Sequence, residues 1–155
     1  MEEKIPIKIT GIVKGTVRDG KTGKIKREYK QKFNLITTVG RTVIAMILSG
    51  DTTYTGIINY GAVGTDDTAV SNSDTKLGTE LFRKLKASAS YIDNVAYISF
   101  FYSTTDFNNT GIKEFGTFID GEAGADTGQI FTHLNVVWSK SNTETLTVDI
   151  IYTVS

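Results

Sequence analysis

The sequence predicts an all-β fold, a single β-sandwich of Greek-key or jelly-roll type with about eight strands, one short helix and an N-terminal β-hairpin. Apolar and polar residues alternate through most of the 155 residues, which is the period of half-buried strands. Turn-forming residues separate these segments at near-regular intervals. The chain has 15 Gly and one Pro, and its many Thr, Val, Ile, Tyr and Phe residues favour strands. Because no repeat or linker interrupts the pattern, we expect one domain over residues 1–155.

Two amphipathic segments predict the N-terminal hairpin. The first, Ile5 to Arg18, places Ile and Val on one face and polar residues on the other. The sequence DGKTG at 19–23 favours a turn, and Ile25 to Leu35 then alternates again. Lysines on the polar face of an outer strand discourage wrong edge pairing. Residues 1–35 could therefore belong to the sandwich or project from it as an arm.

One segment has helical periodicity. Apolar residues between Thr37 and Leu48 recur three and four positions apart, which predicts a short, mostly buried helix. Thr37 or Thr38 could cap its start and Gly50 could end it. A strand is the alternative, because Val and Ile are frequent here.

The rest of the chain predicts six further strands. They run over Gly56–Thr65, Thr79–Tyr91, Val95–Ser103, Ile112–Asp120, Gln129–Ser139 and Leu146–Val154. The segment VAYISFFYS at 95–103 is apolar on both faces, as expected for a central strand. A polar loop at 66–78 and a Gly-rich loop at 121–128 are among the connections between them.

Arg83 and Glu114 stand out because each lies on the apolar face of its predicted strand. A lone charge on a buried face costs several kcal/mol, so such groups are nearly always paired. We therefore expect one structural ion pair between Arg83 and Glu114 that joins two strands.

The composition excludes several function classes. Lys plus Arg equals Asp plus Glu at 17 each, which argues against a binder of duplex nucleic acid. Low net charge also favours association between copies. The chain has no Cys, so disulfides, thiolate metal sites and Cys nucleophiles are excluded. The N-terminus does not resemble a signal peptide, and no apolar stretch is long enough to span a membrane.

Two acidic loops are candidate cation sites. Their carboxylates are Asp66, Asp67 and Asp74 in one loop, and Asp120, Glu122 and Asp126 in the other. Carboxylates suit Ca²⁺, but neither loop has the alternating spacing of a calcium loop. We expect solvated side chains and no metal in both.

His133 is the one histidine, so any Ser-His-Asp site would depend on it. A catalytic His needs a nucleophile and an orienting carboxylate within reach, and no G-x-S-x-G motif supplies the first. We expect His133 to be a surface or partly packed residue. The glycines fit neither a dinucleotide-binding nor a phosphate-binding loop.

Aromatic side chains could form a platform for sugars. The candidates are Tyr54, Tyr60, Tyr91, Tyr97, Tyr102, Trp138 and Tyr152. Most occupy alternating strand positions, so core or interface packing is the favoured interpretation. The Lys-rich hairpin from Lys8 to Lys32 is expected to be a solvated face.

The order of several motifs resembles small virion structural proteins of tailed bacteriophages and prophages, of the tail-fibre, tail-collar or baseplate-associated kind. The motifs are FNLITTVGRTVIAMILSG at 33–50, INYGAVGT at 58–65, L-x-x-E-x-x-R-K at 77–84, I-x-E-x-G-x-F at 112–118 and a Thr-rich strand at 146–153. The resemblance covers roughly Lys21 to Ser155. The loop from Asp66 to Asp74 lacks an expected proline, and a Gly/Ala insertion follows Asp120.

The resemblance implies a base or adaptor module of the virion that closes into a trimer or ring and docks onto other virion proteins. Together with the residue patterns, it predicts a non-enzymatic homo-oligomer without catalytic, cofactor-binding or metal-binding residues. A capsid decoration protein is one alternative. A carbohydrate-binding sandwich that recognises host glycans through Tyr or Trp138 is a second, and a hydrolase acting through His133 is a third.

Overall fold

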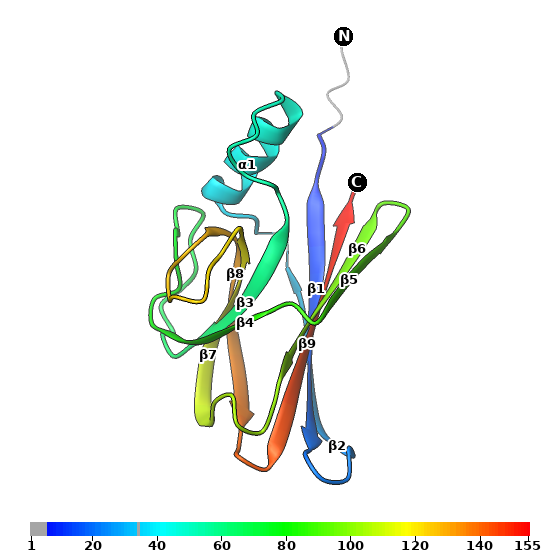
Figure 1. The fold of residues 1–155 in the computed structure, drawn as a ribbon, viewed down its shortest axis with the longest axis vertical. Coiled ribbons are helices and arrows are strands. Elements are labelled where there is room, and N and C mark those ends of the chain that lie inside the picture. Colours follow the sequence, from blue (N-terminus) through cyan, green and yellow to red (C-terminus); the bar gives the residue numbers. More distant parts are fainter. Residues whose placement is uncertain (1–5, 34) are drawn as a thin grey trace.

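The computed structural model describes residues 6–33 and 35–155, which form two antiparallel sheets packed face to face (Figure 1). One sheet has the order β2-β1-β9-β6-β5 and the other the order β4-β3-β7-β8. The elements are β1 (Ile9–Asp19), β2 (Ile25–Phe33), α1 (Thr38–Leu48), β3 (Ile58–Gly64), β4 (Glu80–Leu85), β5 (Ser88–Ile92), β6 (Val95–Tyr102), β7 (Asn109–Ile119), β8 (Gln129–Lys140) and β9 (Glu144–Val154). The predicted all-β sandwich is confirmed.

The described residues contain nine strands because the segment Thr79–Tyr91 divides between the two sheets. Its first part is β4 and its second part is β5. The backbone N–H of Lys86 donates to the carbonyl of Asn59 in β3, and the next N–H, of Ala87, donates to the carbonyl of Ser99 in β6. Neighbouring residues thus bond to different sheets, and the chain crosses between sheets at this point.

The N-terminal hairpin is part of the five-stranded sheet. β1 pairs with β2 on one side and with β9 on the other, from Ile9 opposite Val154 to Asp19 opposite Glu144. The alternative of a projecting arm is therefore wrong for the described part of the hairpin. Ile5, the expected start of the first strand, and Asn34 lie outside the described residues.

The predicted helix is confirmed, with Thr37 as its N-cap, but the expectation that it is mostly buried is wrong. Gly40 and Val43 are its buried residues, and Leu48 is 78% exposed, because only one side of α1 packs on the sandwich. The Thr37 hydroxyl accepts a hydrogen bond from the N–H of Gly40 and donates one to the carbonyl of Ile130 in β8. Gly50, with a φ of 86°, follows the C-cap, where glycine adopts this conformation without strain. The cap thereby fixes α1 against β8 as well as starting the helix.

The core between the sheets is rich in aromatic side chains. Trp138 is 4% exposed, and its ring lies 6.0 Å from that of Tyr29 and 5.7 Å from that of Phe115. A smaller apolar cluster of Ala62, Leu77, Phe118 and Ile130 lies apart from this core. Leu77 comes from the loop at 65–79, so this loop covers the outer face of the four-stranded sheet.

Arg27 and Glu144 close one end of the sandwich. The Arg27 guanidinium donates to both oxygens of Glu144 at 2.9 Å and to the carbonyl of Ser139 in β8. Lys26 adds a second ion pair to Glu144 at 3.1 Å. These cations, together with the Ser141 N–H, hold the pKa of Glu144 well below its ordinary value.

The Glu144 carboxylate should make stability depend on pH. An acid whose pKa is lowered by folding stabilises the fold above its ordinary pKa of 4.5, and this contribution is lost as the pH falls toward the folded value. We expect Glu144→Gln to be less stable than wild type at about pH 6, with the difference narrowing at about pH 3. Urea midpoints at both pH values measure it. A difference that does not change with pH would contradict the assignment.

Candidate functional site

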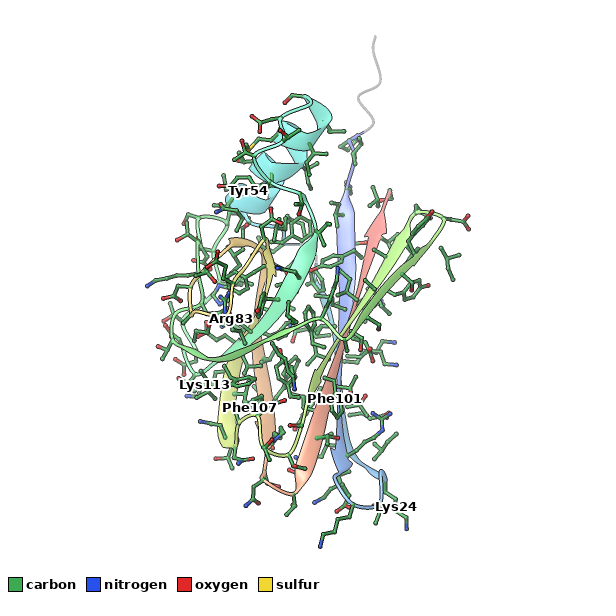
Figure 2. The ribbon with its side chains drawn as sticks, viewed as in Figure 1. Lys24, Tyr54, Arg83, Phe101, Phe107 and Lys113 are labelled. Atoms are coloured by element: carbon green, nitrogen blue, oxygen red, sulfur yellow. The ribbon has the colours of Figure 1, made fainter. Side chains whose placement is uncertain are left out.

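The candidate site lies where two loops, 65–79 and 120–128, cover the outer face of the four-stranded sheet. Buried charged side chains from three strands gather beneath these loops. They are Glu80 and Arg83 of β4, Glu114 of β7 and His133 of β8. Arg83 lies among these loops in Figure 2. The site therefore contains both residues that the sequence singled out as a pair.

Glu114 does not pair with Arg83, so the predicted ion pair is wrong. Its side chain is 1% exposed. The carboxylate accepts hydrogen bonds from the backbone N–H groups of Gly78 at 2.9 Å, Thr79 at 2.8 Å and Asp66 at 3.3 Å. It also lies 2.7 Å from Nε2 of His133. Glu114 thus fastens both ends of the loop at 65–79 to β7.

His133 is buried, contrary to the expected surface or partly packed position, with 5% of its area exposed. Its Nδ1 lies 2.8 Å from Asp74 and its Nε2 lies 2.7 Å from Glu114. Each ring nitrogen is thus within hydrogen-bond distance of one carboxylate, and the imidazole ring bridges the two acids.

The loop reaches His133 because it folds back over β8. The side chain of Asn135 accepts from the N–H of Val70 and donates to the carbonyl of Thr68. We name the set Asp74, His133 and Glu114 the loop clasp. It joins the middle of the loop to its two ends through β7 and β8.

Arg83 forms a buried ion pair with Glu80. Both side chains are 3% exposed, and the guanidinium donates to the two Glu80 oxygens at 2.8 and 2.9 Å. It also donates to the carbonyls of Glu122 and Thr127 and lies 4.5 Å from the centre of the Phe118 ring. Arg83 therefore holds the second loop, 120–128, against the sheet.

An irregularity in the pairing of β4 explains why Arg83 bonds to Glu80 rather than to Glu114. In a regular strand, residues three apart point to opposite faces. The pairing of β3 with β4 shifts between Val63 and Gly64, so that Phe82 and then Glu80 are paired and Leu81 is skipped. Such a bulge places Glu80 and Arg83 on the same face. The alternation of side chains alone could not indicate it.

The acidic loop residues bond to groups of their own loop or of neighbouring segments of the chain. Asp66 accepts from the N–H and hydroxyl of Thr68, and these hydrogen bonds lower its pKa. Asp67 lies 3.3 Å from Lys113, and Asp126 lies 3.7 Å from Lys76. Asp120 accepts from the N–H of Thr55 at 2.8 Å, and Glu122 contributes its backbone carbonyl to Arg83. Within residues 6–33 and 35–155, no three His or acidic side chains gather in a metal-binding arrangement.

A pocket of about 280 Å³ opens beside the loop clasp and is lined by Ser73, Asp74 and His133, among others. Both ring nitrogens of His133 face carboxylates, and among the described residues neither hydrogen-bonds a hydroxyl group. This arrangement is better suited to holding the loop at 65–79 in place than to activating a nucleophile.

The aromatic candidates divide into buried and exposed groups. Trp138, Tyr102 and Tyr152 are buried. The Tyr102 hydroxyl donates to the carbonyl of Gly61, and burial raises the pKa of both tyrosines. Tyr54 and Tyr60 are half-buried, whereas Tyr91 and Tyr97 are exposed. The burial of Trp138 removes the main reason to expect a sugar platform.

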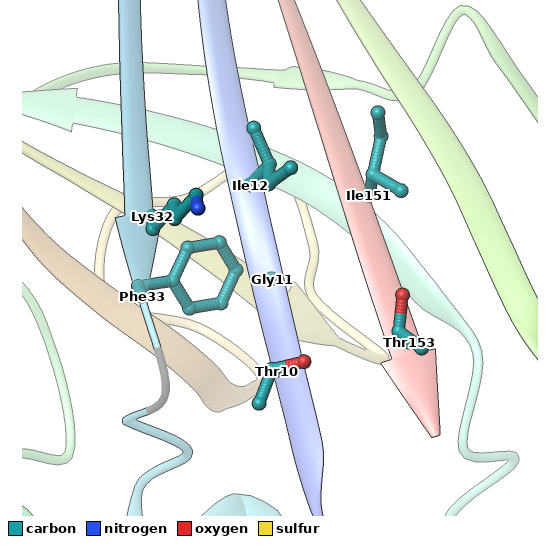
Figure 3. A pocket seen from close by; sticks show the side chains of 7 residues that line it. All are labelled: Thr10, Gly11, Ile12, Lys32, Phe33, Ile151 and Thr153. Carbon is teal, nitrogen blue, oxygen red and sulfur yellow. The ribbon is translucent and has the colours of Figure 1, made fainter. Parts of the chain in front are cut away.

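A second depression, of about 520 Å³, crosses β2, β1 and β9 (Figure 3). The Phe33 ring lies beside Gly11, where a Cβ atom would come 2.1 Å from the ring. Glycine is therefore required for this close approach. The other lining residues are Thr10, Ile12, Lys32, Ile151 and Thr153, and they present mainly methyl and hydroxyl groups.

No helix among the described residues has the length and apolar character needed to cross a membrane. Comparisons with protein families, curated proteins and solved structures gave no match for this chain.

Proposed function

We propose that this protein is a non-enzymatic structural subunit of a tailed-phage virion, similar to a tail-fibre or collar adaptor. It self-associates into a trimer or larger ring and docks onto other virion proteins. The motif order described above supports the virion assignment. The subunit acts by burying surface between copies, so its function depends on a rigid sandwich with contact surfaces on its outside.

One observation carries the proposal: large apolar side chains are exposed on the β5–β6 side of the sandwich. Tyr91 is 79% exposed, Ile92 64%, Phe101 42% and Tyr97 38%. Ile92, Tyr97 and Phe101 share one face of the β5–β6 hairpin, and Tyr91 lies on the other face. Exposed apolar residues gathered on one element often mark protein–protein contacts. The buried charges, in contrast, fasten the protein's own loops, as the loop clasp does. The contact surface and the charged cluster therefore lie on different sheets.

Light scattering tests the self-association. We expect a molar mass of several chains for the purified protein, because the exposed apolar surface favours association at zero net charge. Antibody labelling of particles from the phage or prophage that encodes the chain tests the docking. Label at the tail or collar is expected. A strictly monomeric protein that is absent from the particles would contradict the proposal.

The same labelling distinguishes a capsid decoration protein, the alternative that shares this chemistry. A decoration protein would place the label over the capsid shell. Such a result would keep the self-associating subunit and overturn its assignment to the tail.

A further inference from the structure

β5 is an unprotected edge strand. It pairs with β6 on one side, and the residues that the structure describes place no strand on its other side. All five of its residues, Ser88–Ile92, are exposed. In Figure 1 the β5–β6 hairpin extends away from the four-stranded sheet. An edge strand offers a row of free N–H and C=O groups, which a further strand can pair with.

The other sheet edges carry features that oppose such pairing. β2 contains three lysines, Lys26, Lys30 and Lys32, and charged side chains blunt an edge. β4 contains Glu80, Arg83 and Lys84. The edge of β8 is partly covered, because Thr37 bonds through its N–H and hydroxyl to the carbonyls of Phe131 and Ile130.

β5 has none of these features. Its sequence, SASYI, contains no charge and no proline, and its register with β6 is unbroken. A charged partner strand would place its charges opposite the neutral side chains of β5. Of the edge strands in this chain, the β5 strand of a second copy is therefore the partner that best matches β5 in charge.

The strand is also complementary to itself in size. An antiparallel pair of β5 strands centred on Ser90 places Ala89 opposite Tyr91 and Ser88 opposite Ile92. Each large side chain then meets a small one, on the same face of the sheet. Such a pair has two-fold symmetry, the commonest arrangement in homo-oligomers.

Contacts within one chain already fix the position of the β5–β6 hairpin. β6 pairs with β9 from Val95 to Tyr102. At the hairpin turn, the side chain of Asn94 donates to the carbonyl of Val154, and the N–H of Val154 donates back to Asn94. Because β5 is already extended, pairing with a second strand loses little backbone conformational entropy.

We propose that a second copy of this chain binds at β5, by two-fold antiparallel pairing centred on Ser90, so that the two five-stranded sheets become continuous. This interface rests on the self-association proposed above and names its surface. In an assembly of trimers or rings, this two-fold contact would join two of them, since dihedral assemblies combine two-fold contacts with a higher rotation axis.

A single cysteine tests both the surface and its register, because the chain has no cysteine of its own. Directly opposed residues of an antiparallel pair have Cα atoms about 4.5–5.5 Å apart, which a disulfide can bridge. Under mild oxidation, Ser90→Cys should form a covalent dimer about tenfold faster than Val137→Cys. Val137, 87% exposed on β8, is the matched control. Equal rates for the two variants would overturn the interface.

A charge variant provides a second, independent measurement. Tyr91→Lys adds a charge to the neutral edge, and we expect it to weaken association by about tenfold or more in light scattering. Val137→Lys should leave the mass unchanged, and circular dichroism should show both variants folded. An oligomeric wild type with neither a Ser90→Cys crosslink nor a Tyr91→Lys effect would overturn this interface and leave the proposed function intact. A monomeric wild type would overturn both this interface and the proposed self-association.

Discussion

Replacing Glu114 by alanine is expected to lower the free energy of unfolding by about 3–5 kcal/mol. The substitution removes the acceptor of three backbone N–H groups and leaves His133 beside a cavity. Buried donors without acceptors cost the full desolvation penalty. Urea unfolding of the wild type and the variant measures the change, and a loss below about 1 kcal/mol would show that the loop is held by other contacts.

A double-mutant cycle separates the true partner of Glu114 from the one that the sequence predicted. Glu114→Ala and His133→Ala should be strongly non-additive, because each leaves the other's hydrogen bond unmade. Glu114→Ala and Arg83→Ala should be close to additive. Glu114→Gln, which keeps the volume of the side chain, is the matched control and should cost less than Glu114→Ala.

Replacing Arg83 by alanine is the second large effect, again about 3–5 kcal/mol. It leaves the carboxylate of Glu80 buried without its partner, frees the carbonyls of Glu122 and Thr127, and uncovers the ring of Phe118. Arg83→Lys should recover only part of the loss, because lysine lacks the planar fork that meets both carboxylate oxygens. Full recovery by lysine would contradict the importance of that geometry.

Limited proteolysis shows which loop each residue fastens. Arg83→Ala should expose the loop at 120–128 to cleavage, since its guanidinium holds two carbonyls there. Glu114→Ala should instead expose the loop at 65–79. The same cleavage pattern in both variants would mean that the loops open as one unit.

Most of the fold could be predicted from local patterns. Alternation located the hairpin and the later strands, because one face of each strand is buried. The helix was predictable from its spacing and from the capping residue Thr37. The division at Lys86 and Ala87 was not predictable, because the apolar alternation of the sequence continues from β4 into β5 although the chain bends at Ala87.

The candidate site was predicted only in part. Burial of charge correctly singled out Arg83 and Glu114, but not their partners. The partner of Arg83 depends on a bulge that skips Leu81, and alternation assumes a strand without bulges. His133 is buried by a loop that returns from 59 residues away, and no local pattern indicates where so long a loop will lie.

The pairing of β1 with β9 has a consequence for how the chain is made. β1 is the first strand of the described residues, yet its neighbour in the sheet is the last one, β9, so β1 is made well before the strand it pairs with. Contacts between residues so distant in sequence slow folding. Since β9 also lies between β1 and β6, both of these strands lack a neighbour during synthesis until residues 144–154 have been made, and the five-stranded sheet cannot be completed before then.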